Sequence, residues 1–134
     1  MATIGEVGGI GDKYSRQLRK AGVRTSEGLL KVAALRKGRA QLGDKIGATP
    51  EKVLEWVNRA DLMRVKGIGS EYSDLLECCG VDTVKELKLR NPKALTAAMA
   101  ELNEKKRLVR RLPTEAMVAA WIEAAKSLPP IVKY

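Results

Sequence analysis

Apolar residues recur at helical spacing along most of the chain, and no stretch shows the alternation that a β-strand requires. This spacing marks one face of each of two predicted helices, formed by Tyr14, Leu18 and Ala21 and by Tyr72, Leu76 and Cys79. Gly22 and Gly80 follow where a helix-terminating glycine belongs. Residues typical of helix starts occur at Thr49-Pro50, at Asn91-Pro92 and at Thr83 with Glu86. The sequence therefore predicts an all-α fold.

The helical pattern occurs twice. Residues 7–29 read VGGIGDKYSRQLRKAGVRTSEGL and residues 65–87 read VKGIGSEYSDLLECCGVDTVKEL, at a constant offset of 58 residues. Trp56 and Trp121 are 65 residues apart, so the second copy carries about seven extra residues, placed near residues 100–112. We expect two tandem units, residues 1–64 and 65–134, each with four to five short helices and packed together as one compact body. Both indoles are expected to be buried core anchors at equivalent sites.

Composition narrows the function classes. The 134 residues include 45% apolar and 31% charged side chains, which fits a folded domain rather than a disordered chain. Histidine is absent, which excludes Ser-His and Cys-His nucleophile pairs and histidine zinc ligands. We therefore expect no enzyme activity, no catalytic residue, no cofactor and no metal site.

The two cysteines, Cys78 and Cys79, are adjacent and match no metal-binding spacing. Cys79 is expected to be a small core residue and Cys78 to point outward. Unpaired cysteines predict a reduced, cytoplasmic setting. The apolar stretches fall short of the roughly 18 residues that a membrane span needs, so no membrane partner is expected.

The charge balance favours a polyanionic partner. The chain has 25 basic and 16 acidic residues, a net charge of +9, which for a basic protein indicates nucleic acid. The alternative is that the charge only keeps a small protein in solution. The densest basic cluster consists of Lys105, Lys106, Arg107, Arg110 and Arg111. It either contacts a nucleic-acid backbone or an anionic surface, or is a solvated face paired with Glu101 and Glu104. A looser cluster consists of Lys31, Arg36, Lys37 and Arg39.

Two Gly-Ile-Gly turns precede amphipathic helices. They consist of Gly9, Ile10 and Gly11 and of Gly67, Ile68 and Gly69. Glycine lets a ligand approach the backbone closely, and free amides at a helix start suit a phosphate or another anion. The alternative is a tight turn whose isoleucine packs inward and whose glycines serve geometry alone.

The run Val-Gly-Gly-Ile-Gly-(x)2-Tyr-(x)3-Leu-(x)3-Gly-Val-x-Thr resembles the helix-hairpin-helix family of DNA repair and recombination proteins. The resemblance implies that amides of both turns contact the nucleic-acid backbone without reading sequence, in some members with a bound monovalent cation. The whole chain is similar to a bacterial family of tandem helix-hairpin-helix-like proteins with no established activity. That likeness is carried by EWVNRADLMRVKGIGSEYSDLLECCGVDTVKEL, by LVRRLP and by the Trp-containing last helix. Only eight residues precede Gly9, so the leading helix of the first turn is expected to be very short or absent.

The outer faces of the two copies differ in sign. Positions occupied by Lys13, Arg16, Arg19 and Lys20 in the first copy hold Glu71, Asp74, Glu77 and Cys78 in the second. A phosphate near the second turn would then meet like charge, which opposes binding. We expect phosphate contact at the first turn, with Lys13, Arg16 and Lys20. The second turn is then structural, or faces a basic partner such as the first unit of another copy.

The function expected from these observations is non-enzymatic binding of a nucleic-acid backbone, DNA in the first place, without sequence preference. The alternative is a protein–protein interaction adaptor that keeps the fold and does not bind nucleic acid.

Overall fold

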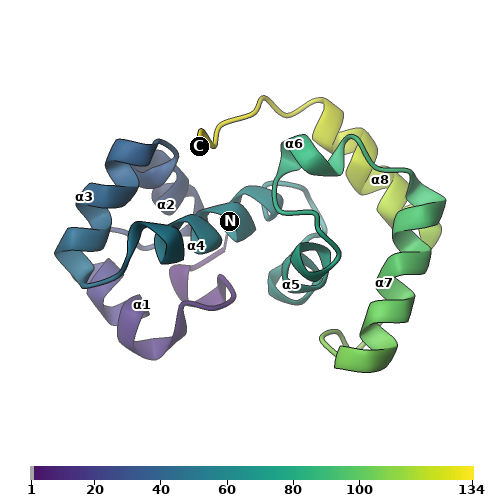
Figure 1. Ribbon diagram of the computed structural model, residues 1–134, viewed down its shortest axis with the longest axis horizontal. Helices are drawn as coiled ribbons and strands as arrows, with labels where there is room; N and C mark the ends of the chain where they lie inside the picture. Colours follow the sequence, from purple (N-terminus) through teal and green to yellow (C-terminus); the bar gives the residue numbers. More distant parts are fainter. Residues whose placement is uncertain (1) are drawn as a thin grey trace.

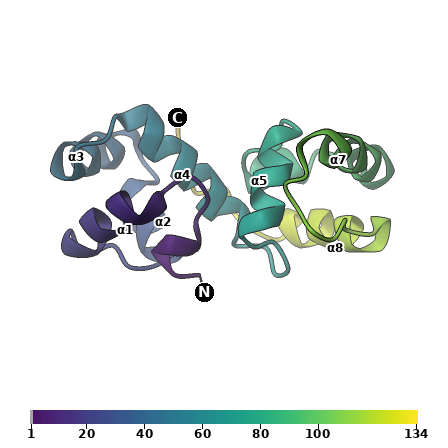
Figure 2. The same ribbon diagram turned by 90° about the horizontal axis from the view of Figure 1, so that it is seen from below.

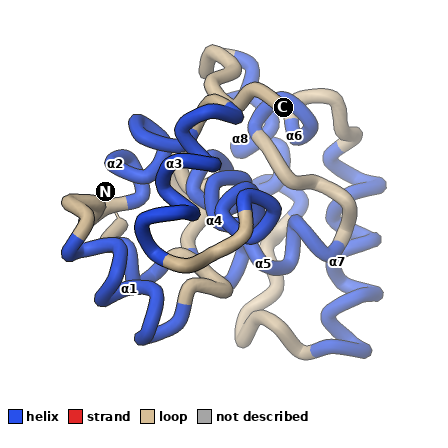
Figure 3. The backbone as a smooth tube through the Cα atoms, turned by 60° about the vertical axis from the view of Figure 1, so that its left-hand side comes forward, coloured by secondary structure: helices blue, strands red, loops and turns tan. Residues whose placement is uncertain are grey.

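A computed structural model describes residues 2–134 as a chain of short helices (Figure 1). Its elements are the 3-10 helix η1 (Ile4–Glu6) and the helices α1 (Gly11–Lys20), α2 (Ser26–Ala33), α3 (Arg36–Ile46), α4 (Pro50–Leu62), α5 (Ser70–Cys78), α6 (Val84–Leu87), α7 (Pro92–Lys106) and α8 (Glu115–Lys126). Residues 2–134 contain no β-strand (Figure 3). An isolated bridge joins Thr3 to Thr25. The predicted all-α class is confirmed, and η1 is the very short leading helix expected before the first turn.

The helix ends follow from local sequence. The side chains of Thr49 and Asn91 accept hydrogen bonds from the first-turn amides of α4 and α7, each helix having proline at its start. Gly22 and Gly80 have φ of 90° and 86°, and the amide after each bonds back across the helix end at 2.8 and 2.9 Å. Ala21 is exposed rather than part of the core, because it caps the end of α1 instead of lying within it.

The buried apolar residues form two clusters. One runs from Ile4 to Ala60 and the other from Leu62 to Ala125. We call η1 to α4 the first lobe and α5 to α8 the second lobe, and Figure 2 shows them side by side with α5 next to α4. Division of the chain at residues 64 and 65 stays a prediction, with which this arrangement agrees.

Each core contains one tryptophan packed against one tyrosine. Trp56 is 0% exposed and lies 5.0 Å from the Tyr14 ring; Trp121 is 3% exposed and lies 5.1 Å from the Tyr72 ring. The two ring pairs are tilted by 54° and 51°. The expectation that both indoles are buried is confirmed, and the tilted geometry is one that aromatic pairs favour.

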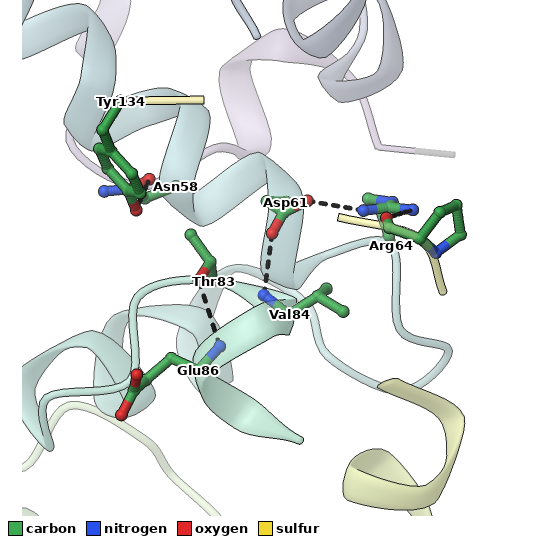
Figure 4. Close-up of polar contacts among 8 residues, drawn as sticks. Asn58, Asp61, Arg64, Thr83, Val84, Glu86 and Tyr134 are labelled. Atoms are coloured by element: carbon green, nitrogen blue, oxygen red, sulfur yellow. Dashed lines mark hydrogen bonds and ion pairs between the residues drawn. The ribbon is translucent and has the colours of Figure 1, made fainter. Parts of the chain in front are cut away.

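Asp61, near the end of α4, ties the first lobe to the second (Figure 4). Its side chain is almost fully buried, and its carboxylate accepts the Val84 amide at 2.8 Å and Arg64 Nη1 at 2.8 Å. Thr83 also accepts the Glu86 amide, so two side chains cap the start of α6. A carboxylate at a helix start is stabilised by the helix dipole as well as by these hydrogen bonds.

The segment after α8 returns to the first lobe (Figure 1). Lys133 donates its amide to the carbonyl of Ala34, and Val132 packs on the first core. Arg39 is buried, because its guanidinium donates to the carbonyls of Ala33, Ala34 and Lys133 at 3.1, 2.8 and 2.6 Å. Arg39 is therefore buried, whereas Lys31, Arg36 and Lys37, the other members of the looser basic cluster, are exposed.

Candidate nucleic-acid interface

The second Gly-Ile-Gly turn connects α4 to α5 and is shaped by its glycines. Gly67 has φ of 97°, and a Cβ there would lie 3.0 Å from Trp121 Nε1. A side chain at this position would be strained by conformation and would also crowd the indole. Ile68 is buried in the second core, whereas Gly67 and Gly69 are exposed. The turn therefore presents bare backbone to solvent above an inward-packed isoleucine.

The start of α5 leaves amides free at this turn. The amides of Gly69, Ser70, Glu71 and Tyr72 donate to no acceptor among residues 2–134, and no side chain caps the helix. The first amides of any helix lack intrahelical partners, and the helix dipole makes this end attractive to anions. The second turn therefore has unused donors for an anionic ligand.

The loop after α7 brings two arginines to the same turn. Asn103 holds the loop through two hydrogen bonds to the Val109 backbone, of 3.0 and 3.2 Å, and the Val109 side chain is buried in the second core. The Tyr72 hydroxyl donates to the carbonyl of Arg111 at 2.9 Å. These contacts fix the loop backbone while its arginine side chains stay exposed.

The turn and the loop together line a shallow groove of about 580 Å³, which we call the arginine groove. Its lining residues are Gly67, Gly69, Ser70, Glu71, Tyr72, Arg110 and Arg111. Arg110 has a side chain 92% exposed, and its Nη2 lies 3.1 Å from the Glu71 carboxylate, which also accepts the Arg110 amide. These hydrogen bonds lower the pKa of Glu71, so this carboxylate is charged at neutral pH.

The predicted basic cluster of residues 105–111 is therefore divided by the fold. Arg110 and Arg111 lie at the second turn, whereas Lys105 and Lys106 end α7 and Arg107 caps it with φ of 50°. All five are exposed. In the part of the chain that the structure describes, the ion pair of this cluster joins Arg110 to Glu71 and not to Glu101 or Glu104.

Two of the three carboxylates expected near the second turn lie instead against the first lobe. Arg59 of α4 places Nε 2.9 Å from Asp74 and 2.8 Å from Glu77, both on α5. One N–H cannot align with both oxygens, and these contacts are ion pairs without aligned hydrogen bonds. Partial burial raises the pKa of Asp74 and of Glu77, and Arg59 opposes that rise. Asp74 and Glu77, two residues of the reversed outer face of α5, therefore pack on the first lobe of the same chain.

The side chains of these ion pairs also contact the first turn. Asp74 lies so close to Gly8 that a Cβ there would overlap its carboxylate, and Arg59 Nη1 donates to the Gly8 carbonyl at 2.9 Å. Two carboxylates share one guanidinium here, so the negative charges on the Gly8 side of the turn outnumber the positive charge of Arg59. Arg59 Nη1 therefore occupies one acceptor position of the Gly8 carbonyl, beside the turn at which the sequence resemblance implies a monovalent cation.

The cations predicted at the first turn lie along α1. Lys13, Arg16 and Lys20 are exposed, as are Gly9 and Gly11, while Ile10 is buried. Lys13 Nζ lies 5.7 Å from the centre of the Tyr14 ring, and Lys52 Nζ of α4 lies 5.9 Å from it. Sequence reasoning missed Lys52 and Arg59, because neither lies near the turn in the chain and no motif marks them.

The adjacent cysteines follow the expected division. Cys78 is exposed, and Cys79 is half-buried against the second core. Burial raises the pKa of the Cys79 thiol, which disfavours the reactive thiolate. In residues 2–134, no three Cys, Asp or Glu side chains are grouped as metal ligands. None of the helices in this range has the length and apolar character that crossing a bilayer requires.

Comparison with known proteins identifies the family. No curated protein and no solved structure matches the chain. A sequence model of DUF4332, a domain of unknown function, matches residues 8–128, which include both turns, the Arg59 ion pairs and the arginine groove. This match spans nearly the whole chain, and the protein therefore belongs to the DUF4332 family.

Proposed function

We propose that this protein binds the sugar–phosphate backbone of nucleic acid, DNA in the first place, without reading base sequence and without catalysing a reaction. The observation that carries the proposal is the arginine groove. It combines free amides at the start of α5 with the exposed side chains of Arg110 and Arg111. Backbone amides, helix starts and arginines are the groups that proteins use against phosphate oxygens.

Three further features support the proposal. The net charge of +9 favours a polyanion. Both turns resemble those of the helix-hairpin-helix family, whose amides contact nucleic-acid backbones. The exposed surface of Gly67 and Gly69 also lets a phosphate approach the main chain without meeting a side chain.

The second turn is the favoured contact and the first turn a secondary one. At the second turn one carboxylate, Glu71, faces Arg110 and Arg111. At the first turn, Asp74 and Glu77 share Arg59 next to Gly8. At the second turn a phosphate therefore meets two arginines and one carboxylate, whereas on the Gly8 side of the first turn two carboxylates outnumber Arg59.

A salt titration tests the proposed function. Binding to a mixed-sequence duplex and to a single strand, measured by fluorescence anisotropy, is expected to weaken steeply as salt rises. Counterion release predicts a log–log slope of about 0.9 per phosphate contacted on duplex and about 0.7 on single strands. Undetectable binding at low salt would reject the proposal and leave the protein–protein adaptor as the remaining reading.

Glu71→Gln is expected to tighten binding several-fold. Glu71 now holds Arg110 through its charged carboxylate, and a phosphate must compete with that carboxylate for the same guanidinium. Removing the charge frees Arg110 and removes a repulsion at the helix start. Anisotropy at fixed salt measures the change, with Glu104→Gln, an exposed glutamate on α7, as the matched control. Weaker binding by Glu71→Gln alone would show that Glu71 positions Arg110 for the ligand.

A further inference from the structure

The second turn stands between two hollows. On one side lies the arginine groove. On the other side lies a hollow of about 410 Å³, lined by residues 65–70 together with Ala2, Glu6 and Met63. Gly67, Gly69 and Ser70 line both hollows. The two hollows therefore adjoin at the glycine backbone, so an extended ligand can pass from one to the other.

A third hollow continues the path along the first lobe. It measures about 960 Å³ and is lined by the start of α2, by Lys31, by Arg64 and by Ile131. It shares Met63 and Lys66 with the hollow beside the second turn. The three hollows therefore adjoin in sequence and form one trough, which we call the cationic trough.

The charges and the floor of the cationic trough match a strand of nucleic acid. Four exposed cations lie along it, and they are Arg110, Arg111, Lys66 and Lys31. Three acidic residues also line it: Glu71 is paired with Arg110, Glu6 accepts the Thr3 amide, and Glu27 lies at the start of α2. Met63 and Ile131 supply apolar surface in the same hollow as Lys31 and Lys66. Spaced cations with apolar surface beside them suit phosphates and unpaired bases together.

We infer that the ligand is a single strand, whose backbone runs from Arg110 and Arg111 across the second turn to Lys66 and Lys31. This inference rests on the proposed function. It adds to that function the class of nucleic acid and two binding residues, Lys66 and Lys31. A duplex is a stiff, convex cylinder whose bases are stacked inside, so it contacts the rim of a trough and not its floor. A single strand bends and exposes its bases, so it can follow all three hollows.

The test compares a 12-nucleotide thymidine strand with a 12-base-pair mixed-sequence duplex by fluorescence anisotropy. The variant is Lys31→Glu with Lys66→Glu, and the matched control is Lys85→Glu with Lys93→Glu. All four lysines are exposed, and the control pair lines none of the three hollows. Circular dichroism and the melting temperature establish that both variants keep the fold.

The single strand is expected to bind at least about 10-fold more tightly than the duplex. The variant is expected to lower the single-strand salt slope by about 1.4 and the affinity at 0.1 M salt by about 25-fold, the value for two lost phosphate contacts. The control variant is expected to lose much less, because it changes net charge alone.

Three results would overturn the inference. The first is tighter binding of the duplex than of the single strand. The second is an equal loss of single-strand affinity in the variant and in the control. The third is no loss of affinity in the variant, although binding still depends on Arg110 and Arg111. The last result would leave the proposed function in place and remove only the path to Lys31. Absence of binding by either probe at low salt would instead reject the proposed function itself.

Discussion

Arg110→Glu with Arg111→Glu is expected to weaken duplex binding about 60-fold at 0.1 M salt. The figure follows from counterion release, in which the loss of two phosphate contacts lowers the log–log salt slope by about 1.8. Both side chains are exposed at the second turn, while the loop backbone is held by Asn103, Val109 and Tyr72. The substitution therefore reverses both charges and leaves in place the contacts of Asn103, Val109 and Tyr72 that hold the loop backbone. Anisotropy titrations at several salt concentrations measure both quantities.

Lys13→Glu with Arg16→Glu makes the same charge change at the first turn and is the matched comparison. We expect a smaller loss, because Asp74 and Glu77 already lie beside that turn and disfavour a phosphate there. An equal loss from the two pairs would show that general surface charge governs binding. A larger loss at Lys13 and Arg16 would place the main contact at the first turn.

Trp56→Ala and Trp121→Ala are each expected to lower the free energy of unfolding by about 3–5 kcal/mol, the cost of an unfilled cavity in a packed core. Each indole is buried and packs on one tyrosine, and each belongs to a different core. The two changes together are expected to be nearly additive, because the residues share no partner. Urea denaturation followed by circular dichroism measures the loss, since each substitution removes one of the two tryptophan fluorophores.

Trp56→Phe is the control that separates volume from hydrogen bonding. Trp56 Nε1 is buried and donates to no acceptor among residues 2–134, so phenylalanine removes no hydrogen bond there. We expect a loss well below that of Trp56→Ala, since most of the ring volume is retained. A loss below about 1 kcal/mol for Trp56→Ala would contradict the core role of the indole.

Much of the fold was predictable because its signals are local. Glycines 22 and 80 end helices where a positive φ is needed, and Thr49, Thr83 and Asn91 cap helices through bonds to amides three residues ahead. The burial of the two tryptophans was predictable because small or branched apolar residues lie at helical spacing on either side of each one. Patterns of this kind involve only neighbours along the chain, so the sequence displays them directly.

The contacts between lobes were not predictable in this way. Asp74 and Glu77 looked like charges on the solvent side of a helix, and their partner Arg59 belongs to a different helix whose angle to α5 no local pattern encodes. Arg39 looked like one more surface cation in the sequence. It is buried because its guanidinium donates hydrogen bonds to carbonyls at the end of α2 and in the segment after α8. In both cases a charge is placed by the packing of whole helices rather than by its neighbours in sequence.

The candidate site shows the same division. The two Gly-Ile-Gly turns and the basic cluster were visible in the sequence, but nothing there joined Arg110 to the second turn. The position of Arg110 depends on the hydrogen bonds of Asn103 to the Val109 backbone, which hold the loop after α7. It also depends on the hydrogen bond from the Tyr72 hydroxyl to the Arg111 carbonyl. A side-chain amide bonding a residue six positions ahead has no sequence signature, so the turn most favoured from sequence was the first rather than the second.

The return of the tail to the first lobe bears on the order in which the protein is made. On the ribosome, η1 to α4 are synthesised first, yet Arg39 gains its third carbonyl partner only when Lys133 has emerged. Val132 likewise covers the first core only at that stage. Until then the Arg39 guanidinium lacks one hydrogen-bond acceptor, and the part of the first core that Val132 covers is exposed to water. Both effects lower the stability of the first lobe. The half that is translated first is therefore the half that reaches its final packing last.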